Sequence, residues 1–427
     1  MGLEEKPVGH GDSTSSQETP DEAGSPAPEI DPVPNGGATA WLQVLGSFFL
    51  FFNTWGFVNS FGQFQAYYET VLHNSPSDIS WIGTVQGFIL LLVGIITGPI
   101  YDLGYFRALI MSGTFLLVFG MMMLSIADQY YQIFLAQAIA AGLGAGCLFV
   151  PSVGIVTQYF TTKRAFATGI AAAGGSIGGA IYPIVFHELQ PVVGFGWATR
   201  VIAFISLATL LVSLAIAKPR VMALQKRALF DPSAFRDMRF VLCCLGLFLA
   251  FVGMYFPFYY VSSWATTKLD VSPRLAFYMF SILNFASVFG RILPGLVADR
   301  LGSLNIMIPF LLFTAILGFA WNSVENLAGL IVICIFYGFF SGACVSLPPT
   351  IVAGICTTPS RVGTWMGMCF SFAGLGLLIG NPIAGSILDS KGGGFDGAQY
   401  FSAAAIMGGA LSMCAMRWLA RQPAKAA

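Results

Sequence analysis

Charged side chains are scarce in this sequence of 427 residues, since Asp, Glu, Lys and Arg together make up only 9% of it. Soluble domains carry about 25% charged residues, so this chain has too little polar surface to be a water-soluble globular protein. Its 20 basic residues balance its 20 acidic ones, and this neutral charge gives no reason to expect nucleic acid as a partner. Hydrophobic residues make up 56%, and the mean hydropathy is +0.76. The composition predicts a polytopic protein of the lipid bilayer.

Sequence signals for chemical catalysis are also missing. The eight cysteines lie in or beside apolar runs and lack the spacing of zinc ligands, so we expect small buried side chains without disulfides. Glycine-rich stretches such as 174–179 fall within apolar runs with no preceding strand, which argues against a phosphate-binding loop. No apolar run carries a carboxylate or an imidazole near its middle. We therefore expect no metal, no cofactor and no enzymatic activity.

Residues 1–38 differ from the rest of the chain. They hold eight acidic residues and one lysine, with many Ser, Pro and Gly. Such a segment cannot bury enough apolar surface to fold, so we expect a disordered cytosolic tail. Because it lacks the apolar core of a cleaved signal peptide, the first membrane helix should act as the signal.

Twelve apolar runs are long enough to cross a bilayer as helices, which takes about 20 residues. They lie at residues 41–66, 79–100, 106–126, 131–157, 165–187, 196–217, 240–264, 274–297, 304–322, 327–353, 362–388 and 398–420. These runs predict an all-α membrane protein with twelve transmembrane helices. Asp78 precedes the second run, and we expect it to be the N-cap of that helix.

The basic residues predict the orientation of the chain. If the runs cross alternately, 14 of the 20 Lys and Arg residues fall in the loops and the C-terminal end on the side that holds both termini, and Lys6 of the N-terminal tail lies there too. The loops of the other side hold only Lys268, Arg274 and Lys391. Because cytoplasmic loops are enriched in Lys and Arg, we expect both termini in the cytosol.

The two halves of the chain repeat each other at a spacing of 197 residues. The pairs at this spacing include Gly56 and Gly253, Asp102 and Asp299, Cys147 and Cys344, Pro151 and Pro348, and Arg164 and Arg361. They indicate a duplicated unit, with six-helix bundles over 39–217 and 240–421, a cytosolic linker over 218–239 and a short cytosolic tail over 422–427. Two parallel six-helix repeats with a substrate site between them are typical of the major facilitator fold.

Arg291 lies inside the apolar run SVFGRILPGLVADRLG of residues 287–302. It is eight residues from Asp299 at the cytosolic helix end, or about 12 Å at 1.5 Å per residue. An unpaired guanidinium is costly in hydrocarbon, so something must compensate its charge. Either it binds an acidic group of a substrate in a water-filled cavity, or it donates hydrogen bonds to backbone carbonyls. We favour substrate binding.

Four stretches resemble the monocarboxylate porters of the major facilitator superfamily. YFTTKRAFATGIAAAGGSIG at 159–178 is similar to the signature of their fifth helix, and PNGGATAW at 34–41 resembles their entry motif with Asn35 in place of Asp. NTWGFVNSFGQFQAYY at 53–68 resembles the fungal branch. RILPGLVAD at 291–299 is similar to the eighth helix, whose arginine binds the substrate carboxylate in that family. The resemblance implies a plasma-membrane location.

Two departures from the family change what the resemblance implies. Proton-coupled animal members carry an Asp where this chain has Ser287 and a Lys where it has Asn59. Lactate-like proton symport therefore cannot be carried over. For fungal members the resemblance implies uptake of organic acids or riboflavin, or export of small secondary metabolites.

Five further polar or aromatic residues inside the apolar runs are candidates for the substrate site, and four of them lie on the first and seventh helices, which usually line the cavity of this fold. They are Trp55, Asn59, Tyr255, Tyr259 and Asn284. The rings suit an aromatic substrate. The two amides either line the cavity or form hydrogen bonds between helices.

The segment GLVADRLG at 295–302, with Asp299 and Arg300, resembles the superfamily loop that acts as a conformational latch. Its counterpart in the first half carries Asp102 and Arg107. A carboxylate at a helix end can accept hydrogen bonds from the N-terminus of a neighbouring helix, and such bonds can form and break as the halves rock. The alternative is a plain polar turn.

The sequence thus favours a transporter of a small organic solute, anionic or aromatic, with export preferred over uptake of a monocarboxylate or riboflavin-like nutrient. A sensor built on a transporter fold is a distant alternative.

Overall fold

The computed structural model describes residues 33–72, 74–220, 230–356, 361–390 and 394–421. Every regular element in these ranges is a helix, so the expected all-α fold is confirmed. The predicted tails at 1–38 and 422–427 lie wholly or largely outside the described residues, as do residues 221–229 of the predicted linker.

The first half of the chain forms eight α-helices and a π-helical turn. They are α1 Gly37–Asn59, α2 Phe61–Val71, α3 Pro76–Leu92, α4 Gly94–Asp102, α5 Phe106–Leu124, α6 Tyr130–Ile133, η1 Phe134–Ala141, α7 Gly142–Tyr159 and α8 Arg164–Ile216. The second half forms η2 Pro232–Arg236, α9 Met238–Met254, α10 Phe256–Leu269, α11 Pro273–Leu301, α12 Ser303–Ala320, η3 Trp321–Ser323, α13 Leu327–Ser346, α14 Pro348–Ile355, α15 Val362–Ser390 and α16 Asp396–Arg421.

Eleven helical stretches of the described residues are long and apolar enough to cross a membrane, rather than the twelve expected. The difference arises at α8, which joins the fifth and sixth predicted helices across a kink at Gly194. A straight helix of 53 residues would be about 80 Å long, far more than the roughly 30 Å of a bilayer core. Gly194 has a φ of 79°, a left-handed value that suits glycine and turns the chain back. The kink therefore separates two crossings.

Several crossings consist of two helices in line. Pro257 and Pro348 occupy the first turns of α10 and α14, directly after breaks at Tyr255 and Leu347. Proline lacks an N–H group and clashes with the preceding turn, which explains these two breaks. They place Tyr255 at a point where the backbone of a crossing departs from a regular helix.

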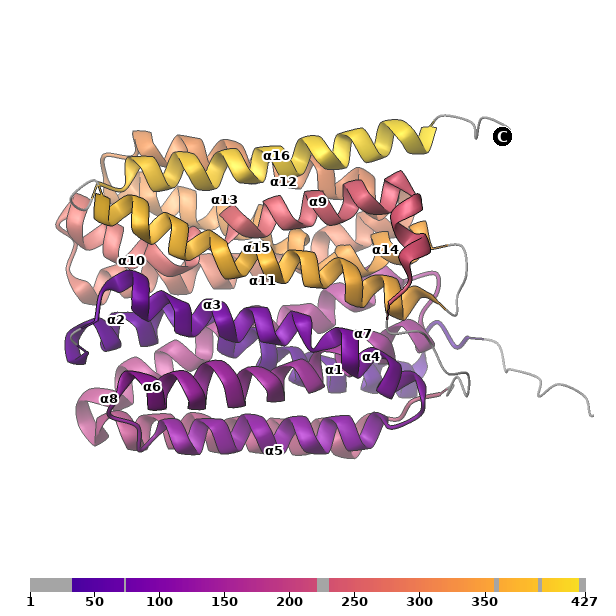
Figure 1. Ribbon diagram of the computed structural model, residues 1–427, viewed down its shortest axis with the longest axis horizontal. Coiled ribbons are helices and arrows are strands. Elements are labelled where there is room, and N and C mark those ends of the chain that lie inside the picture. Colours follow the sequence, from indigo (N-terminus) through magenta and orange to yellow (C-terminus); the bar gives the residue numbers. More distant parts are fainter. Residues whose placement is uncertain (1–32, 73, 221–229, 357–360, 391–393, 422–427) are drawn as a thin grey trace, which may run out of the picture. The chain divides into compact units, whose positions relative to one another are not determined.

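Figure 1 shows the helices of the two halves side by side, with the first half (indigo to pink) below the second (red through orange to yellow). Within the halves α1 packs on α8, and α9 packs on α15 and α16. Between the halves the main contacts are α3 with α15 and α8 with α11. These two helix pairs form the interface on which any site between the halves depends.

Both ends of the described chain lie on one side of the membrane region. The Asn35 amide, just before α1, donates to the Tyr159 carbonyl at the end of α7, and α16 ends on the same side, at the right of Figure 1. We call this the terminal side, and we call the side that holds α2, α6 and α10 the opposite side.

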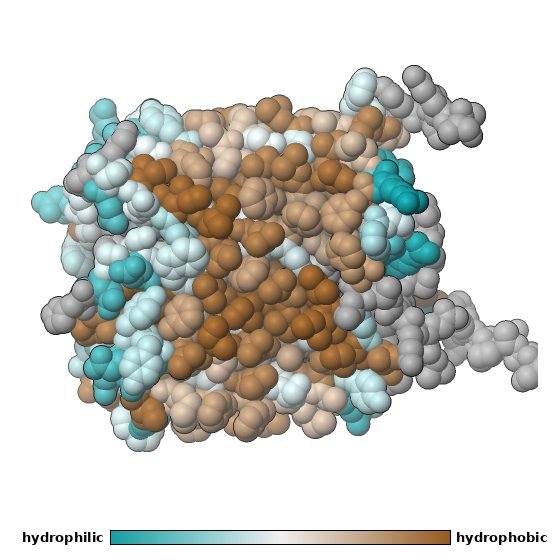
Figure 2. Space-filling model, in the orientation of Figure 1, coloured by the Kyte–Doolittle hydropathy of each residue, from teal (hydrophilic) through white to brown (hydrophobic). Residues whose placement is uncertain are grey.

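The surface matches a bilayer. Figure 2 shows a broad apolar band across the middle of the molecule, with hydrophilic side chains towards both ends. Large apolar side chains such as Phe115 and Phe285 are 66% and 60% exposed. An apolar surface of this extent is compatible with hydrocarbon and not with water.

The predicted N-cap at Asp78 is wrong. The cap of α3 is Ser75, whose hydroxyl accepts from the Asp78 amide, while the Asp78 carboxylate accepts from the Ser75 amide at 3.3 Å. Asp78 is thus the third residue of a capping box. Pro76 and Ser77 form the first turn, and proline is favoured there because its missing N–H needs no partner.

Candidate functional site

Arg291 lies in the interface between α8 and α11. Its side chain is almost fully buried, and its Nη1 donates to the Ala172 carbonyl of α8 at 2.6 Å. Its Nε is buried with no hydrogen-bond partner in the part of the chain that the structure describes. A guanidinium has five N–H donors and stays charged in proteins. The Ala172 bond therefore compensates this charge only in part.

An aromatic pair from both halves lies close to Arg291. The ring of Trp55 on α1 stacks on Tyr255, at the break between α9 and α10, with centroids 6.0 Å apart and an interplanar angle of 16°. Phe149 and Phe251 meet Trp55 edge-on. The indole Nε1 of Trp55 is buried without a partner among the described residues. The pair offers flat apolar surface together with one unused donor.

Asn59 on α1 and Asn284 on α11 both lie against the same face of α8, beside Gly179. The Asn59 amide group is 3.5 Å from the Gly175 carbonyl, and that of Asn284 donates within its own helix to Phe280. Each leaves its Oδ1 buried and without a partner in the described ranges. Buried polar atoms are rarely left unpaired, so two such acceptors in one interface call for an explanation.

Two glycines of α8 bring these residues together. A Cβ built on Gly175 would lie 2.8 Å from both Arg291 Nη1 and Trp55 Cβ. A Cβ on Gly179 would lie 2.7 Å from Asn284 Oδ1 and 2.8 Å from Asn59 Cβ. Any larger side chain would therefore push these groups apart. Four of the six predicted site residues meet at this pair of glycines, and Tyr255 joins them through Trp55.

Tyr259 lies farther towards the opposite side. Its ring is 5.4 Å from that of Phe61, across the two halves. Its hydroxyl and the side-chain amide of Asn381 on α15 are both buried and lie close to each other. Asn381 was not among the predicted site residues, although a polar residue inside the apolar run 362–388 was a usable signal.

Ser287 stands where proton-coupled relatives of the resembled family carry an Asp. Its hydroxyl is 2.6 Å from that of Ser176 on α8, and it also donates to the Asn284 carbonyl. The position is thus occupied by a neutral hydrogen-bonded pair that links the two halves. The sequence alone gave no sign of Ser176 as its partner.

The predicted latch residue Asp299 caps α8. Its two carboxylate oxygens accept from the amides of Ala165 at 2.8 Å and Phe166 at 3.1 Å. These amides belong to the first turn of α8, where the helix dipole favours a negative charge. Gly295, one turn earlier on α11, packs on the same turn, because a Cβ there would lie 2.6 Å from the Ala165 carbonyl. The cap therefore joins the second half to the first on the terminal side.

The other three predicted latch residues are less informative. Arg300 is exposed at the end of α11, and Arg107 is exposed in the first turn of α5. Asp102 ends α4, but its side chain lies outside the described ones.

The interface between the halves is closed on both sides. On the terminal side Asp299 caps α8, and a Cβ on Gly367 of α15 would lie 3.4 Å from Ile95 Cα of α4. On the opposite side a Cβ on Gly62 would lie 2.7 Å from the Phe258 carbonyl, and the rings of His187 and Phe277 stack at 4.4 Å. The residues around Arg291 are therefore enclosed between two closures.

Comparisons with known proteins agree with this architecture. The profile of the Major Facilitator Superfamily matches residues 44–356. The MFS-type transporter dbaD of Emericella nidulans is 48% identical over 83% of this chain and 80% of its own length. The aspyridones efflux protein apdF of the same species is 39% identical over 90% of this chain and 79% of its own. The agnestins efflux protein AgnL12 of Paecilomyces divaricatus is 38% identical, with coverages of 88% and 86%.

Solved structures give the same fold. The human organic anion transporter MFSD10 superposes with a TM-score of 0.65 at 17% identity, covering 88% of this chain and 98% of that one. The fucose:proton symporter of E. coli gives a TM-score of 0.63 with the same coverages. At such identity the likeness shows the fold alone. Together with the profile match and the fungal relatives, it establishes that this chain is a multi-pass membrane transporter of the Major Facilitator Superfamily.

Proposed function

We propose that this transporter exports a small aromatic metabolite with an acidic group, and that the metabolite binds between the halves at Arg291. One observation carries the proposal: Nη1 of Arg291 and the Cβ of Trp55 lie equally close to the same point above Gly175. The unpaired Nε of Arg291 can bind an acid group while the rings of Trp55 and Tyr255 hold a flat hydrophobic body. The site residues are thus Arg291, Trp55, Asn59, Tyr255, Tyr259 and Asn284.

Export is favoured by the names of the relatives. Two of them are described as efflux proteins, one for aspyridones and one for agnestins. We extend that direction of transport to this chain, and we take its cargo to be a secondary metabolite of similar chemistry. Uptake of a monocarboxylate or riboflavin-like nutrient is the alternative.

We further propose that the chain belongs to the monocarboxylate porter family but lacks the Asp and the Lys of its proton-coupled members. The pair of Ser176 and Ser287 and the amide of Asn59 occupy positions where proton-coupled members carry charged groups. No group at these positions titrates between pH 5 and 8. The central site therefore transports without taking up a proton, unless the substrate carries one itself.

The transport cycle needs the two halves to act as bundles, over 39–217 and 240–421, that rock about the site. We place both termini in the cytosol and the protein in the plasma membrane, because the terminal side carries most of the Lys and Arg residues. In this orientation Asp299 closes the cytosolic side.

The test is a comparison of metabolites inside and outside the native cell, with and without this gene. If the protein is an exporter, its cargo accumulates inside the cells of the deletion strain and is missing from their medium. The cargo is then offered to cells that carry the wild-type protein, Arg291→Ala or Arg200→Ala. Arg200 is the matched control, because it lies away from the site, bonded to Ser125 and stacked over Trp197.

Export by wild type and by Arg200→Ala, but not by Arg291→Ala at equal membrane abundance, supports the proposal. A compound that stays unused in the medium of the deletion strain makes the protein an importer and contradicts the export. Unchanged export by Arg291→Ala contradicts the proposal that the substrate binds at Arg291.

A further inference from the structure

A groove on the terminal side lies where α8 begins and α11 ends. It has a volume of about 810 Å³ and is lined by residues of both halves. Lys163 and Phe166 come from the first half, and Leu296, Val297 and Arg300 come from the second. The groove is therefore complete only while these two helix ends lie together.

The part of the groove nearer to the membrane core is apolar. Leu296 precedes Arg300 by four residues on α11, which places it about 6 Å deeper at 1.5 Å per residue. Leu296 and Val297 are 46% and 44% exposed, and Phe166 on α8 is partly exposed. Apolar surface one turn inside a helix end lies near the boundary between lipid headgroups and hydrocarbon. Acyl chains can therefore pack on this floor.

The rim of the groove is basic. Lys163 directly precedes α8, Arg300 is the penultimate residue of α11, and both are exposed. Neither forms an ion pair with a carboxylate in the part of the chain that the structure describes. Asp299 also lines the groove, but its two oxygens accept from the amides of Ala165 and Phe166. Its charge is thus engaged with the start of α8, and the two positive charges of the rim remain available to an anion.

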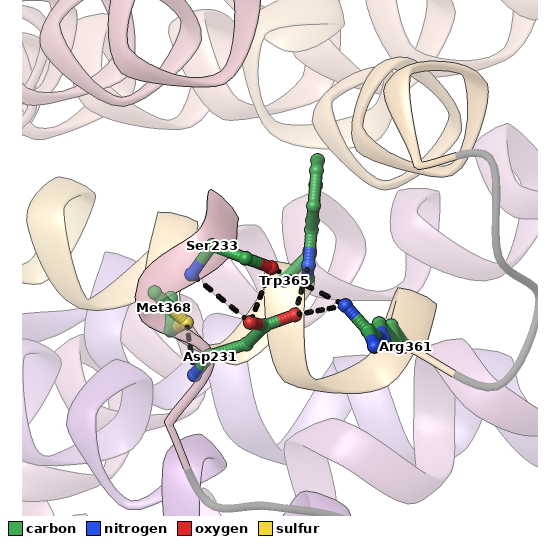
Figure 3. A network of polar contacts seen from close by, with 5 residues as sticks. All are labelled: Asp231, Ser233, Arg361, Trp365 and Met368. Carbon is green, nitrogen blue, oxygen red and sulfur yellow. Dashed lines mark hydrogen bonds and ion pairs between the residues drawn. The ribbon is translucent and has the colours of Figure 1, made fainter. Parts of the chain in front are cut away.

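Arg361 shows how a basic residue of the terminal side is paired within the protein. It directly precedes α15 and lies 3.3 Å from the Asp231 carboxylate (Figure 3). The same carboxylate accepts from the Trp365 indole on α15 at 3.1 Å and from the amide and hydroxyl of Ser233. Arg361 thus has an acidic partner already. Asp231 at the same time fixes the start of α15, where Gly367 packs on α4 of the first half.

We propose that the groove binds one anionic phospholipid of the terminal-side leaflet. The headgroup lies between Lys163 and Arg300, and the acyl chains lie on Leu296 and Val297. Charge complementarity favours this occupant, because basic pockets between transmembrane helices on the cytoplasmic side suit anionic headgroups. A zwitterionic lipid brings no net negative charge, and a free phosphate has no chain for the apolar floor.

The bound lipid bridges the two halves. Lys163 belongs to the first half and Arg300 to the second, so one headgroup joins the same helix ends that Asp299 joins. In the orientation proposed above, the terminal side faces the cytoplasmic leaflet, which is the leaflet that carries anionic lipids. The site lies apart from Arg291 and does not depend on the identity of the cargo.

The test measures lipid binding to the purified full-length protein by native mass spectrometry. The protein in a neutral detergent is titrated with phosphatidylserine or with phosphatidylcholine of the same acyl chains. We expect wild type to bind one phosphatidylserine about 25-fold more tightly than phosphatidylcholine, at about fivefold for each cation near the headgroup. Lys163→Gln and Arg300→Gln should each lower this preference about fivefold, and the double variant should abolish it.

The double variant also shows whether one lipid uses both cations. In a shared site it weakens a single binding event about 25-fold, whereas two separate lipids would each lose about fivefold. The second pattern contradicts the proposal. Both positions are exposed, so all three variants should keep the melting temperature of wild type.

Arg236→Gln is the matched control. Arg236 is exposed on η2, close to the start of α9 on the same side, and it does not line the groove. This variant should keep the wild-type preference, and excess inorganic phosphate should leave the bound phosphatidylserine in place. Equal affinities of wild type for the two lipids overturn the proposal. An equal loss in Arg236→Gln overturns it as well, and displacement by inorganic phosphate would make the groove a site for free phosphate instead.

Discussion

Arg291 donates from Nη1 to the carbonyl of Ala172 over 2.6 Å, and this bond joins the second half of the chain to the first. The same guanidinium can hold a substrate acid only if its other donors turn towards the ligand, or if this bond gives way. Binding and the closure of α8 against α11 are therefore coupled through one side chain. A carboxylate is a stronger acceptor for a guanidinium than a backbone carbonyl, which favours exchange of partners on binding.

Arg291→Lys should fail almost as completely as Arg291→Ala. Lysine keeps the charge but lacks the planar fork that can donate to Ala172 and to an acid group together. Since hydrogen bonds to charged groups contribute about 1.5–3 kcal/mol, we expect initial export rates to fall roughly 10- to 100-fold in both variants. Rates are measured with the identified cargo in cells with matched membrane abundance. Near-normal export by Arg291→Lys would show that charge alone is sufficient.

Gly175→Ala should lower both stability and transport. The added methyl group would lie 2.8 Å from Arg291 Nη1 and from Trp55 Cβ, so these groups must shift. Overpacking of this kind costs about 1–3 kcal/mol. The measurements are the melting temperature in detergent and the export rate.

The control for this change is Gly354→Ala on α14, where a new Cβ meets nothing within 4 Å. Alanine is a better helix former than glycine, so this variant should be as stable as wild type or more so. Equal losses in both variants would mean that the effect of Gly175→Ala is not specific to the site.

Local features of the sequence predicted much of this architecture. The crossings follow from the length of apolar runs, which is a property of contiguous residues. Asp299 was expected to accept hydrogen bonds from the end of a neighbouring helix, and it does accept them from the first turn of α8. The same local approach misplaced the N-cap of α3 at Asp78, because Ser75 precedes it and forms the other half of a capping box.

Contacts between residues far apart in the chain could not be predicted from the sequence. Ser176 and Ser287 are 111 residues apart, and Asp231 and Trp365 are 134 apart. Nothing in the apolar stretch around Ser176 or in the polar linker around Asp231 indicates such partners. The convergence of Arg291, Trp55 and the two amides on α8 likewise depends on how three helices pack. Its only local trace is the pattern of glycines at 174–179, which indicates close packing but not what packs there.

Asp299→Ala should open the terminal side. The substitution leaves the amides of Ala165 and Phe166 without their acceptor at the start of α8. Loss of such a cap costs about 0.5–2 kcal/mol, which is enough to shift a balanced equilibrium several-fold. We expect a higher ratio of open to closed states, measured by double electron–electron resonance between spin labels at Ala108 of α5 and Ala420 of α16, both of which are exposed. Export should be slower because the closed state is reached less often. Glu325→Ala, at an exposed position between α12 and α13, is the control and should change neither quantity.

The attachment of Asp231 to α15 should resist acid down to low pH. The bond from the Ser233 hydroxyl, followed by those from the Trp365 indole and the Ser233 amide and the charge of Arg361, lowers the pKa of Asp231 against the effect of burial. A carboxyl whose pKa is lower in the folded state stabilises the fold above its unfolded pKa of about 3.9, and this stabilisation is lost as the pH falls through the folded value. The Asp231-dependent part of the ratio should therefore stay constant from neutral pH to about pH 5 and disappear only below about pH 4. It is measured as the difference in spin-label ratio between wild type and Asp231→Asn at each pH. A difference that vanishes near pH 6 would show that a group other than this carboxylate controls the ratio.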